Sequence, residues 1–158
     1  MDIIKSKACS FTGHRIIENT AMPTLMVNLR ETCEELILQG YDTFISGGAR
    51  GFDLLSAETV LSLKKIHPHI RLVMALPCRN QTQGWGNADK ERYDNILALA
   101  DSLEYVSENY FTGCMQIRNR FMINNSSVCV AYLKNIGSGT YKTVLYAKET
   151  GIKVINLA

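Results

Sequence analysis

The sequence predicts an α/β fold in three layers, a mainly parallel sheet of about six strands covered by helices on both faces. Short apolar runs alternate with amphipathic helical patterns along the whole chain, and parallel strands need such crossover connections. The 158 residues, of which 46% are hydrophobic and 20% charged, are typical of a globular protein with one core. We therefore expect residues 1–158 to form a single domain.

The first half of the chain supplies three of the expected strands. Residues 8–11 form a short apolar run, residues 41–45 a second β-type run, and residues 70–76 a third that Pro77 closes. The helix between the first two has apolar positions at Leu25, Met26, Leu29, Cys33, Leu36 and Ile37. The helix between the second and third is lined by Phe52, Leu55, Val60, Leu61 and Leu63. Gly40 ends the earlier helix, and the later one ends before Pro68.

The second half repeats the alternation after a polar loop at residues 78–86. The expected elements are a helix capped by Asn87, a strand at 103–106, a helix at 112–124, a strand at 128–133, a helix at 140–149 and a strand at 152–157. Right-handed crossovers place every strand-to-helix loop at one edge of the sheet, where such folds bind ligands.

Composition excludes several classes of function. No apolar run approaches the ~18 residues that span a membrane, and the first seven residues lack the apolar core of a signal peptide, so we expect a cytoplasmic protein with no membrane partner. The net charge is +2, which does not favour nucleic-acid binding, although it does not exclude it. The five cysteines include no CxxC pair and are odd in number, so neither a zinc site nor a disulfide framework is expected. Of these, Cys9, Cys33 and Cys129 are expected in the core, and Cys78 and Cys114 near the ligand loops.

A glycine-rich turn follows the second expected strand and opens a helix. It contains Ser46, Gly47, Gly48, Ala49, Arg50, Gly51 and Asp53. Unpaired N–H groups and the helix dipole at such a turn can hold a phosphate or carboxylate, and glycines let the ligand approach the main chain. The turn matches neither the P-loop nor GxGxxG, and three glycines favour a ligand over a simple tight turn.

Three other segments meet this turn at the same edge: residues 12–15, the helix that starts near residue 112, and residues 137–140. The last segment, Gly137, Ser138, Gly139 and Thr140, is a second candidate phosphate cradle. Arginines gather in or near these loops, at positions 15, 50, 79, 92, 118 and 120. Anionic groups of a ligand would offset the cost of placing cations beside helix N-termini, although single arginines can also point to solvent or pair with acids.

For each of three further side chains, two interpretations remain open. Asp53 is either a helix-capping carboxylate or a contact to ribose hydroxyls. His14, beside Gly13 and Arg15, is either a proton donor near a ligand or a structural residue. Trp85 either stacks on a base or covers the core from a loop.

Five motifs in order resemble the YpsA-like family of the SLOG superfamily. They are FTGHR at residues 11–15, SGGARGFD at 46–53, the run of Gln83, Trp85, Arg92 and Tyr93, RNRFM at 118–122, and Gly139 with Thr140. The superfamily also contains DNA-processing protein A and the LOG phosphoribohydrolases. The resemblance covers nearly the whole chain and implies a Rossmann-like fold with a site for a nucleotide or nucleotide-derived ligand, such as ADP-ribose or a nucleoside monophosphate.

The enzymatic branch of this superfamily provides a test. LOG enzymes carry an arginine in a Met-x-x-Arg segment, which Met115 and Arg118 match, and a glutamate directly after their Gly-Thr motif. Here Tyr141, Lys142 and Thr143 follow Gly139 and Thr140, and no acid takes that place. Cleavage of an N-glycosidic bond usually uses a carboxylate, which would have to be Asp53 or Glu149.

We therefore expect a protein that binds a nucleotide-derived ligand in a sensing or signalling role, with no certain cofactor, no metal, and no assigned catalytic residue. The phosphates would lie against the two glycine-rich segments, with Arg15 and Arg118 neutralising them and Asn119 beside them. The alternatives are a nucleotide-hydrolysing enzyme and a single-stranded DNA-binding protein like DNA-processing protein A. The superfamily also makes a homodimer an open alternative.

Overall fold

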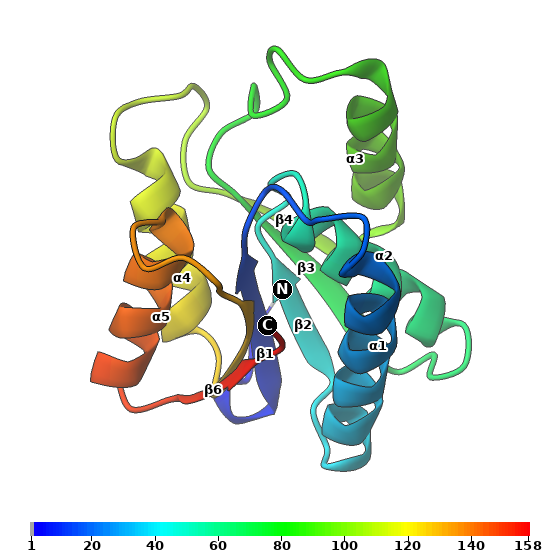
Figure 1. The fold of residues 1–158 in the computed structure, drawn as a ribbon. Helices are drawn as coiled ribbons and strands as arrows, with labels where there is room; N and C mark the ends of the chain where they lie inside the picture. Colours follow the sequence, from blue (N-terminus) through cyan, green and yellow to red (C-terminus); the bar gives the residue numbers. More distant parts are fainter. Residues whose placement is uncertain (1) are drawn as a thin grey trace.

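Six parallel strands form one sheet in the order β4-β3-β2-β1-β5-β6 (Figure 1). The computed structural model describes residues 2–158. The strands are β1 (Ala8–Gly13), β2 (Thr43–Ser46), β3 (Arg71–Leu76), β4 (Ser102–Tyr105), β5 (Val128–Tyr132) and β6 (Lys153–Asn156). The helices are the short η1 (Lys5–Lys7), α1 (Met22–Leu38), α2 (Phe52–Lys64), α3 (Asn87–Leu99), α4 (Cys114–Asn124) and α5 (Gly139–Glu149). The predicted α/β class with a parallel sheet of six strands is confirmed.

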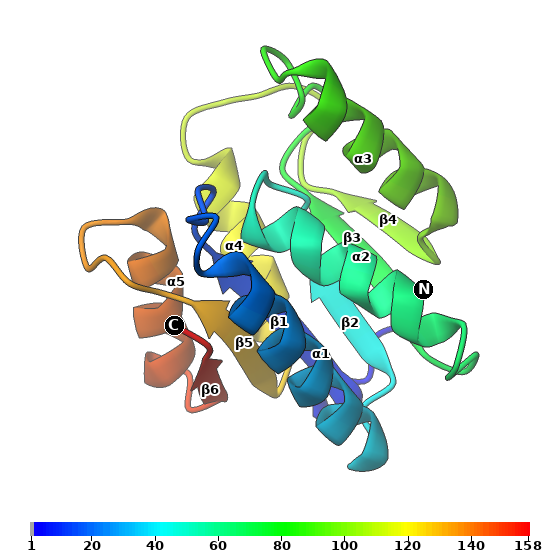
Figure 2. The same cartoon turned by 45° about the vertical axis from the view of Figure 1, so that its right-hand side comes forward.

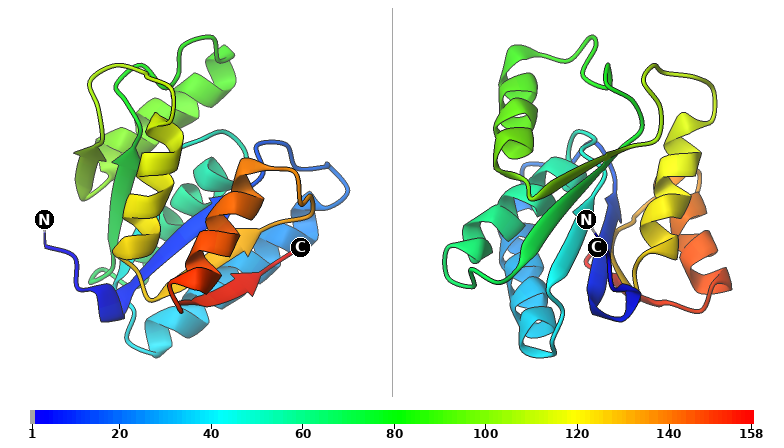
Figure 3. Two further views of the ribbon diagram at one scale, coloured as in Figure 1. Left: turned by 90° about the vertical axis from the view of Figure 1, so that its left-hand side faces the viewer. Right: turned by 180° about the vertical axis from the view of Figure 1, so that it is seen from behind.

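The helices cover both faces of the sheet. Helices α1, α2 and α3 lie side by side on one face, and α4 and α5 pack together on the other (Figures 2 and 3). Within residues 2–158, no helix has both the length and the apolar character that a membrane crossing requires.

Alternating strand residues explain the two-sided core. On β3, Leu72, Met74 and Leu76 belong to the large apolar cluster beneath α1, α2 and α3, whereas Val73 and Ala75 belong to a smaller cluster on the α4 side. Successive side chains point to opposite faces of a strand, so a strand buried on both faces is apolar throughout. This is the reason that the strands appear in the sequence as unbroken apolar runs.

The strand order creates a switch point beside β1. The chain moves outward from β1 through β2 and β3 to β4, and then returns to place β5 on the other side of β1. The loops after β1 and β5 therefore diverge toward opposite faces of the sheet, which opens a crevice at their carboxyl ends.

Small differences from the expected boundaries have local causes. Helix α3 is capped by Gly86, with Asn87 as its first residue, and β4 begins one residue earlier than expected. Helix α4 begins at Cys114 because Gly113, at φ +94°, adopts the left-handed conformation just before it. The five cysteines are free and buried, as expected for the three core positions.

Candidate functional site

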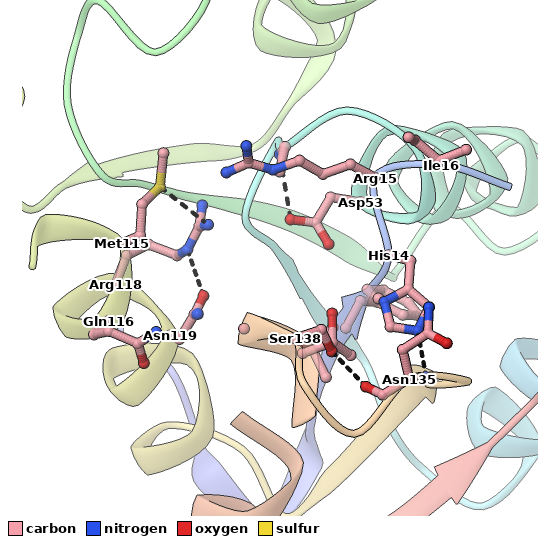
Figure 4. Close-up of a pocket in the computed structure, with 16 residues that line it drawn as sticks. His14, Arg15, Ile16, Asp53, Met115, Gln116, Arg118, Asn119, Asn135 and Ser138 are labelled. Carbon is pink, nitrogen blue, oxygen red and sulfur yellow. Dashed lines mark hydrogen bonds between the residues drawn. The ribbon is translucent and has the colours of Figure 1, made fainter. Parts of the chain in front are cut away.

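A cavity of about 480 Å³, called the main cavity below because most of the predicted residues line it, lies at the crevice between the carboxyl ends of β1 and β5 (Figure 4). Ten of the site residues predicted from the sequence line it: Gly13, His14, Arg15, Ala49, Asp53, Arg118, Asn119, Ser138, Gly139 and Thr140. The four predicted segments thus meet at one edge of the sheet.

A neighbouring cavity of about 330 Å³ adjoins the main one. Arg15, Ala49 and Met115 line both cavities, and Arg50 and Trp85 line only the second. The remaining predicted residues line neither cavity: Ser46, Gly47, Gly48, Gly51 and Gly137. The predicted residues thus make up much of the lining of the main cavity and less of the second, and most of the glycine-rich turn lines neither.

The glycine-rich turn is held by contacts inside the protein. Ser46 donates a hydrogen bond to the Asp53 carbonyl at 2.8 Å and accepts one from the Gly48 amide at 3.4 Å. Gly51 adopts φ +77°, and a Cβ there would lie 2.3 Å from the carbonyl oxygen of Arg15. The close passage of the loop after β1 therefore requires glycine at position 51, independently of any ligand.

Arg118 is buried beneath the turn, with 4% of its surface exposed. Its guanidinium donates hydrogen bonds to the carbonyl of Gly47 and, at 3.4 Å, to that of Ala75. Its Nε donates to Asn119 at 2.8 Å. Burial lowers the pKa of Arg118, and the nearby charge of Arg15 lowers it too, while Asp53 opposes both effects. Arg118 thus supports the turn from below and also borders the main cavity.

Asp53 is a buried carboxyl group that borders the main cavity and is 6% exposed. Burial raises its pKa to about 6, against the opposing effects of Arg118, the Ala49 amide and Arg15. Its Oδ2 accepts a hydrogen bond from the Ala49 N–H at 3.2 Å. The side chain therefore stabilises the turn that precedes its own helix and sits at the cavity wall (Figure 4).

The N-terminus of α5 faces the main cavity. Ser138 caps this helix, because its Oγ accepts a hydrogen bond from the Tyr141 amide at 3.2 Å. Among residues 2–158, the amides of Gly139 and Thr140 have no hydrogen-bond acceptor. Two free N–H groups and the positive end of the helix dipole favour an anion at this point.

His14 connects the loop after β1 to the loop after β5. Its Nε2 accepts hydrogen bonds from the amides of Lys134 at 2.8 Å and Asn135 at 3.2 Å. Burial, and then the charge of Lys134, lower the pKa of His14, which favours the neutral ring. This geometry favours the structural interpretation of His14, since only its Nδ1 remains for a ligand.

Arg15 is the exposed cation of the site. Its side chain lines both cavities and forms no hydrogen bond or ion pair with other residues in the described range 2–158. Arg15 lies close enough to Arg118 to lower the pKa of Arg118, and the cavity wall carries these two arginines against one carboxyl group, that of Asp53. The local charge therefore favours an anionic ligand.

The second cavity contains the aromatic part of the site. The guanidinium carbon of Arg50 lies 5.4 Å from the centroid of the Trp85 ring, and Trp85 meets Tyr93 edge to face, also at 5.4 Å. Trp85 also packs against the main core cluster. Both interpretations of Trp85 thus find support, since it covers the core and lines a cavity.

Several lining residues were not predicted as site residues, among them Ile16, Gln81, Met115, Gln116 and Asn135. Met115 lies one helical turn before Arg118, a spacing that would have identified it as a neighbour on the same face. No comparable signal identified Gln81, because its burial depends on contacts with distant residues. Within residues 2–158, no three His, Cys, Asp or Glu side chains are placed to hold a metal ion.

The chain has relatives of known sequence and known structure. The chain is 34% identical over 147 residues to the uncharacterised SPβ prophage-derived protein YoqJ of Bacillus subtilis, covering 85% of this chain and 86% of that protein. The structure superposes on DNA processing protein A of Helicobacter pylori, described for its single-stranded DNA binding mode, with a TM-score of 0.69 and 20% identity. It superposes on DNA processing protein A of Streptococcus pneumoniae with a TM-score of 0.66 and 15% identity.

These structural relatives are longer proteins. The matches cover 95% and 94% of this chain but only 64% and 49% of the H. pylori and S. pneumoniae proteins.

A family model, that of the YspA SLOG family, matches residues 13–151 and includes the loops that form both cavities. The resemblance seen in the sequence motifs is confirmed, and this chain belongs to the YspA SLOG family.

Proposed function

We propose that this protein binds a nucleotide or nucleotide-derived ligand, such as ADP-ribose or a nucleoside monophosphate, in a sensing or signalling role. The observation that carries the proposal is the junction of two unlike cavities at Arg15, Ala49 and Met115. One cavity contains a free helix N-terminus and cations, and the other contains a tryptophan with an arginine over its ring. A nucleotide has the same division into an anionic part and a planar aromatic part.

The phosphate would lie in the main cavity, between the N-terminus of α5 and Arg15. The amides of Gly139 and Thr140 would donate hydrogen bonds to it, and the guanidinium of Arg15 is free to form a charge-assisted pair. Arg118 would contribute its charge from below while it remains bonded to the Gly47 carbonyl. Backbone contacts to the phosphate would come from the N-terminus of α5 more than from the first glycine-rich turn, because the Gly48 and Ala49 amides of that turn already have acceptors.

The sensing role rests on the missing acid. Position 141 is tyrosine, and Glu149 lies at the far end of α5, in a groove with Arg120 and Lys142 rather than in the main cavity. Without an acid at that place, a ligand would be bound and released unchanged unless Asp53 acts on it. Cytoplasmic residence and a single domain remain predictions of the sequence, and a homodimer remains an alternative that the superfamily resemblance leaves open.

Asp53 supports a second candidate function, hydrolysis of a nucleotide. Its carboxyl group borders the main cavity, and its pKa of about 6 is suited to proton transfer near neutral pH. The carboxyl group also accepts a hydrogen bond from the Ala49 amide, which gives it a structural role in the turn as well. A catalytic role requires the base-to-sugar bond of the ligand to lie next to this carboxyl group.

Calorimetric titration of the protein with ADP-ribose, NAD and purine and pyrimidine monophosphates tests the first proposal. Saturable binding of at least one nucleotide at one site per chain would support it, and no heat from any nucleotide would refute it. Chromatography of the same mixtures after long incubation distinguishes the candidates, because only the hydrolase releases free base. A single-stranded oligonucleotide serves as the third arm, since binding that weakens steeply with salt would favour a nucleic-acid ligand instead.

A further inference from the structure

The second cavity contains a buried hydrogen-bond acceptor without a donor. Gln81 lines this cavity and is 8% exposed. Its Oε1 has no hydrogen-bond partner among residues 2–158, and no other buried side-chain nitrogen or oxygen in that range lacks one. Buried polar groups in proteins are almost always paired, so an acceptor left unpaired at a cavity wall indicates a donor that arrives with a ligand.

The contacts around Gln81 fix which end of its amide is left without a partner. The Nε2 group donates to the carbonyl oxygen of Gly47 at 3.4 Å and to the hydroxyl of Tyr93 at 3.5 Å. Reversing the amide would set its oxygen against the Gly47 carbonyl, which can only accept. The NH₂ group is therefore committed to the protein, and the oxygen is the end of the Gln81 amide that lacks a partner.

The rest of the cavity suits a flat heteroaromatic group. The Arg50 guanidinium lies over the Trp85 ring and both groups line the cavity, and guanidinium planes and aromatic rings both stack on bases. Tyr110, which is exposed, lines the same cavity. The junction at Arg15 connects this wall to the anion-binding end of the main cavity.

We infer that the second cavity binds the base of the ligand and that Gln81 Oε1 accepts a hydrogen bond from an amino group on the edge of that base. This inference rests on the proposed function and names the ligand class as nucleotides of amino-bearing bases. Gln81 Oε1 is itself buried, so a rotation of this side chain on binding would bring it to an amino group that projects from the ring. The ring N–H of uracil is flanked by two carbonyl oxygens, which would meet that acceptor unfavourably.

Comparison of two ligands on the unmodified protein tests the inference. AMP and purine riboside monophosphate differ only in the amino group of AMP, so titration with each isolates the hydrogen bond to Gln81. We expect AMP to bind about tenfold more tightly, as the loss of one partner of a buried acceptor predicts. Equal affinities would overturn the inference and leave the proposed function standing, whereas no binding of either nucleotide would overturn both.

Substitution of Gln81, measured with the same two nucleotides, separates the hydrogen bond from other effects of the residue. Gln81→Met keeps the length of the side chain and removes its amide, so it should weaken AMP binding about tenfold and change purine riboside monophosphate binding by less than about twofold. Gln83→Met is the matched control, because Gln83 is an exposed glutamine on the same loop and lines the same cavity. It should keep the preference for AMP. An equal loss for both nucleotides in Gln81→Met would show that the residue only shapes the loop, and would contradict the inference.

Discussion

Arg118 and Asp53 are buried, oppositely charged residues that both pack against Gly47. A Cβ added to this glycine would lie 2.5 Å from Arg118 Nη1 and 2.8 Å from Asp53 Oδ2. Arg118 also donates to the Gly47 carbonyl, so the arginine of α4 holds the turn between β2 and α2. Arg118 belongs to α4 on one face of the sheet and Asp53 to α2 on the other, so the two helices meet at this glycine.

Gly47→Ala should therefore destabilise the protein. The added methyl group must displace a buried guanidinium and carboxyl group, and overpacking of this kind costs about 1–3 kcal/mol in the free energy of unfolding. Urea unfolding of the variant measures the loss. Gly137→Ala is the control, since a Cβ there meets no atom within 4 Å, and it should change the free energy of unfolding little. Equal stability of Gly47→Ala and the wild type would contradict the packing of Arg118 against this turn.

Asp53→Asn should change how stability depends on pH. The pKa of Asp53 rises from its ordinary value of 3.8, which applies to the unfolded chain, to about 6 in the folded protein. The folded state therefore binds this proton more tightly than the unfolded state does. The resulting stabilisation is complete below pH 3.8 and is lost as the pH rises through about 6. Relative to Asp53→Asn, the wild type should lose about 3 kcal/mol across this window.

Unfolding in urea at several pH values measures this difference. The comparison between variants is needed because the lowered pKa of His14 has the opposite effect, with stability lost as the pH falls. Asp94→Asn, at an exposed position on α3, should reproduce the wild-type profile. Parallel profiles for Asp53→Asn and the wild type would show that Asp53 ionises as freely in the folded protein as in the unfolded chain.

Arg15→Ala should weaken nucleotide binding without loss of stability. Arg15 is exposed and makes no ion pair within residues 2–158, so its removal deletes only a charge at the cavity wall. The loss of one charge-assisted contact to phosphate predicts about tenfold weaker binding in a calorimetric titration. Arg120→Ala, an exposed arginine of α4 that lines a different groove, should bind as the wild type does. If both variants bind equally well, Arg15 has no part in the site.

The sequence predicted the fold well because its signals are local. Each strand is an apolar run, and each helix has apolar positions at helical spacing, so the alternation that defines a parallel sheet was visible without tertiary information. The order of the strands was not predicted, because it depends on which crossover turns to which face.

The sequence predicted which segments form the candidate site better than it predicted the role of each residue. The glycines of the first turn suggested a ligand, yet Gly47 and Gly51 are required by Arg118 and by the carbonyl of Arg15. Gln81 resembled any polar residue of a loop, since its burial arises from contacts with Gly47 and Tyr93. Contacts between distant segments leave no mark in the local pattern.

The central claim is that the N-terminus of α5 binds the phosphate of a nucleotide. An amide NMR titration of the protein with ADP-ribose tests this directly, because it observes the N–H groups of Gly139 and Thr140 themselves. The account predicts saturable shifts at these two amides, with further changes around Arg15. Unchanged amides at Gly139 and Thr140, with shifts confined to other surfaces, would contradict it.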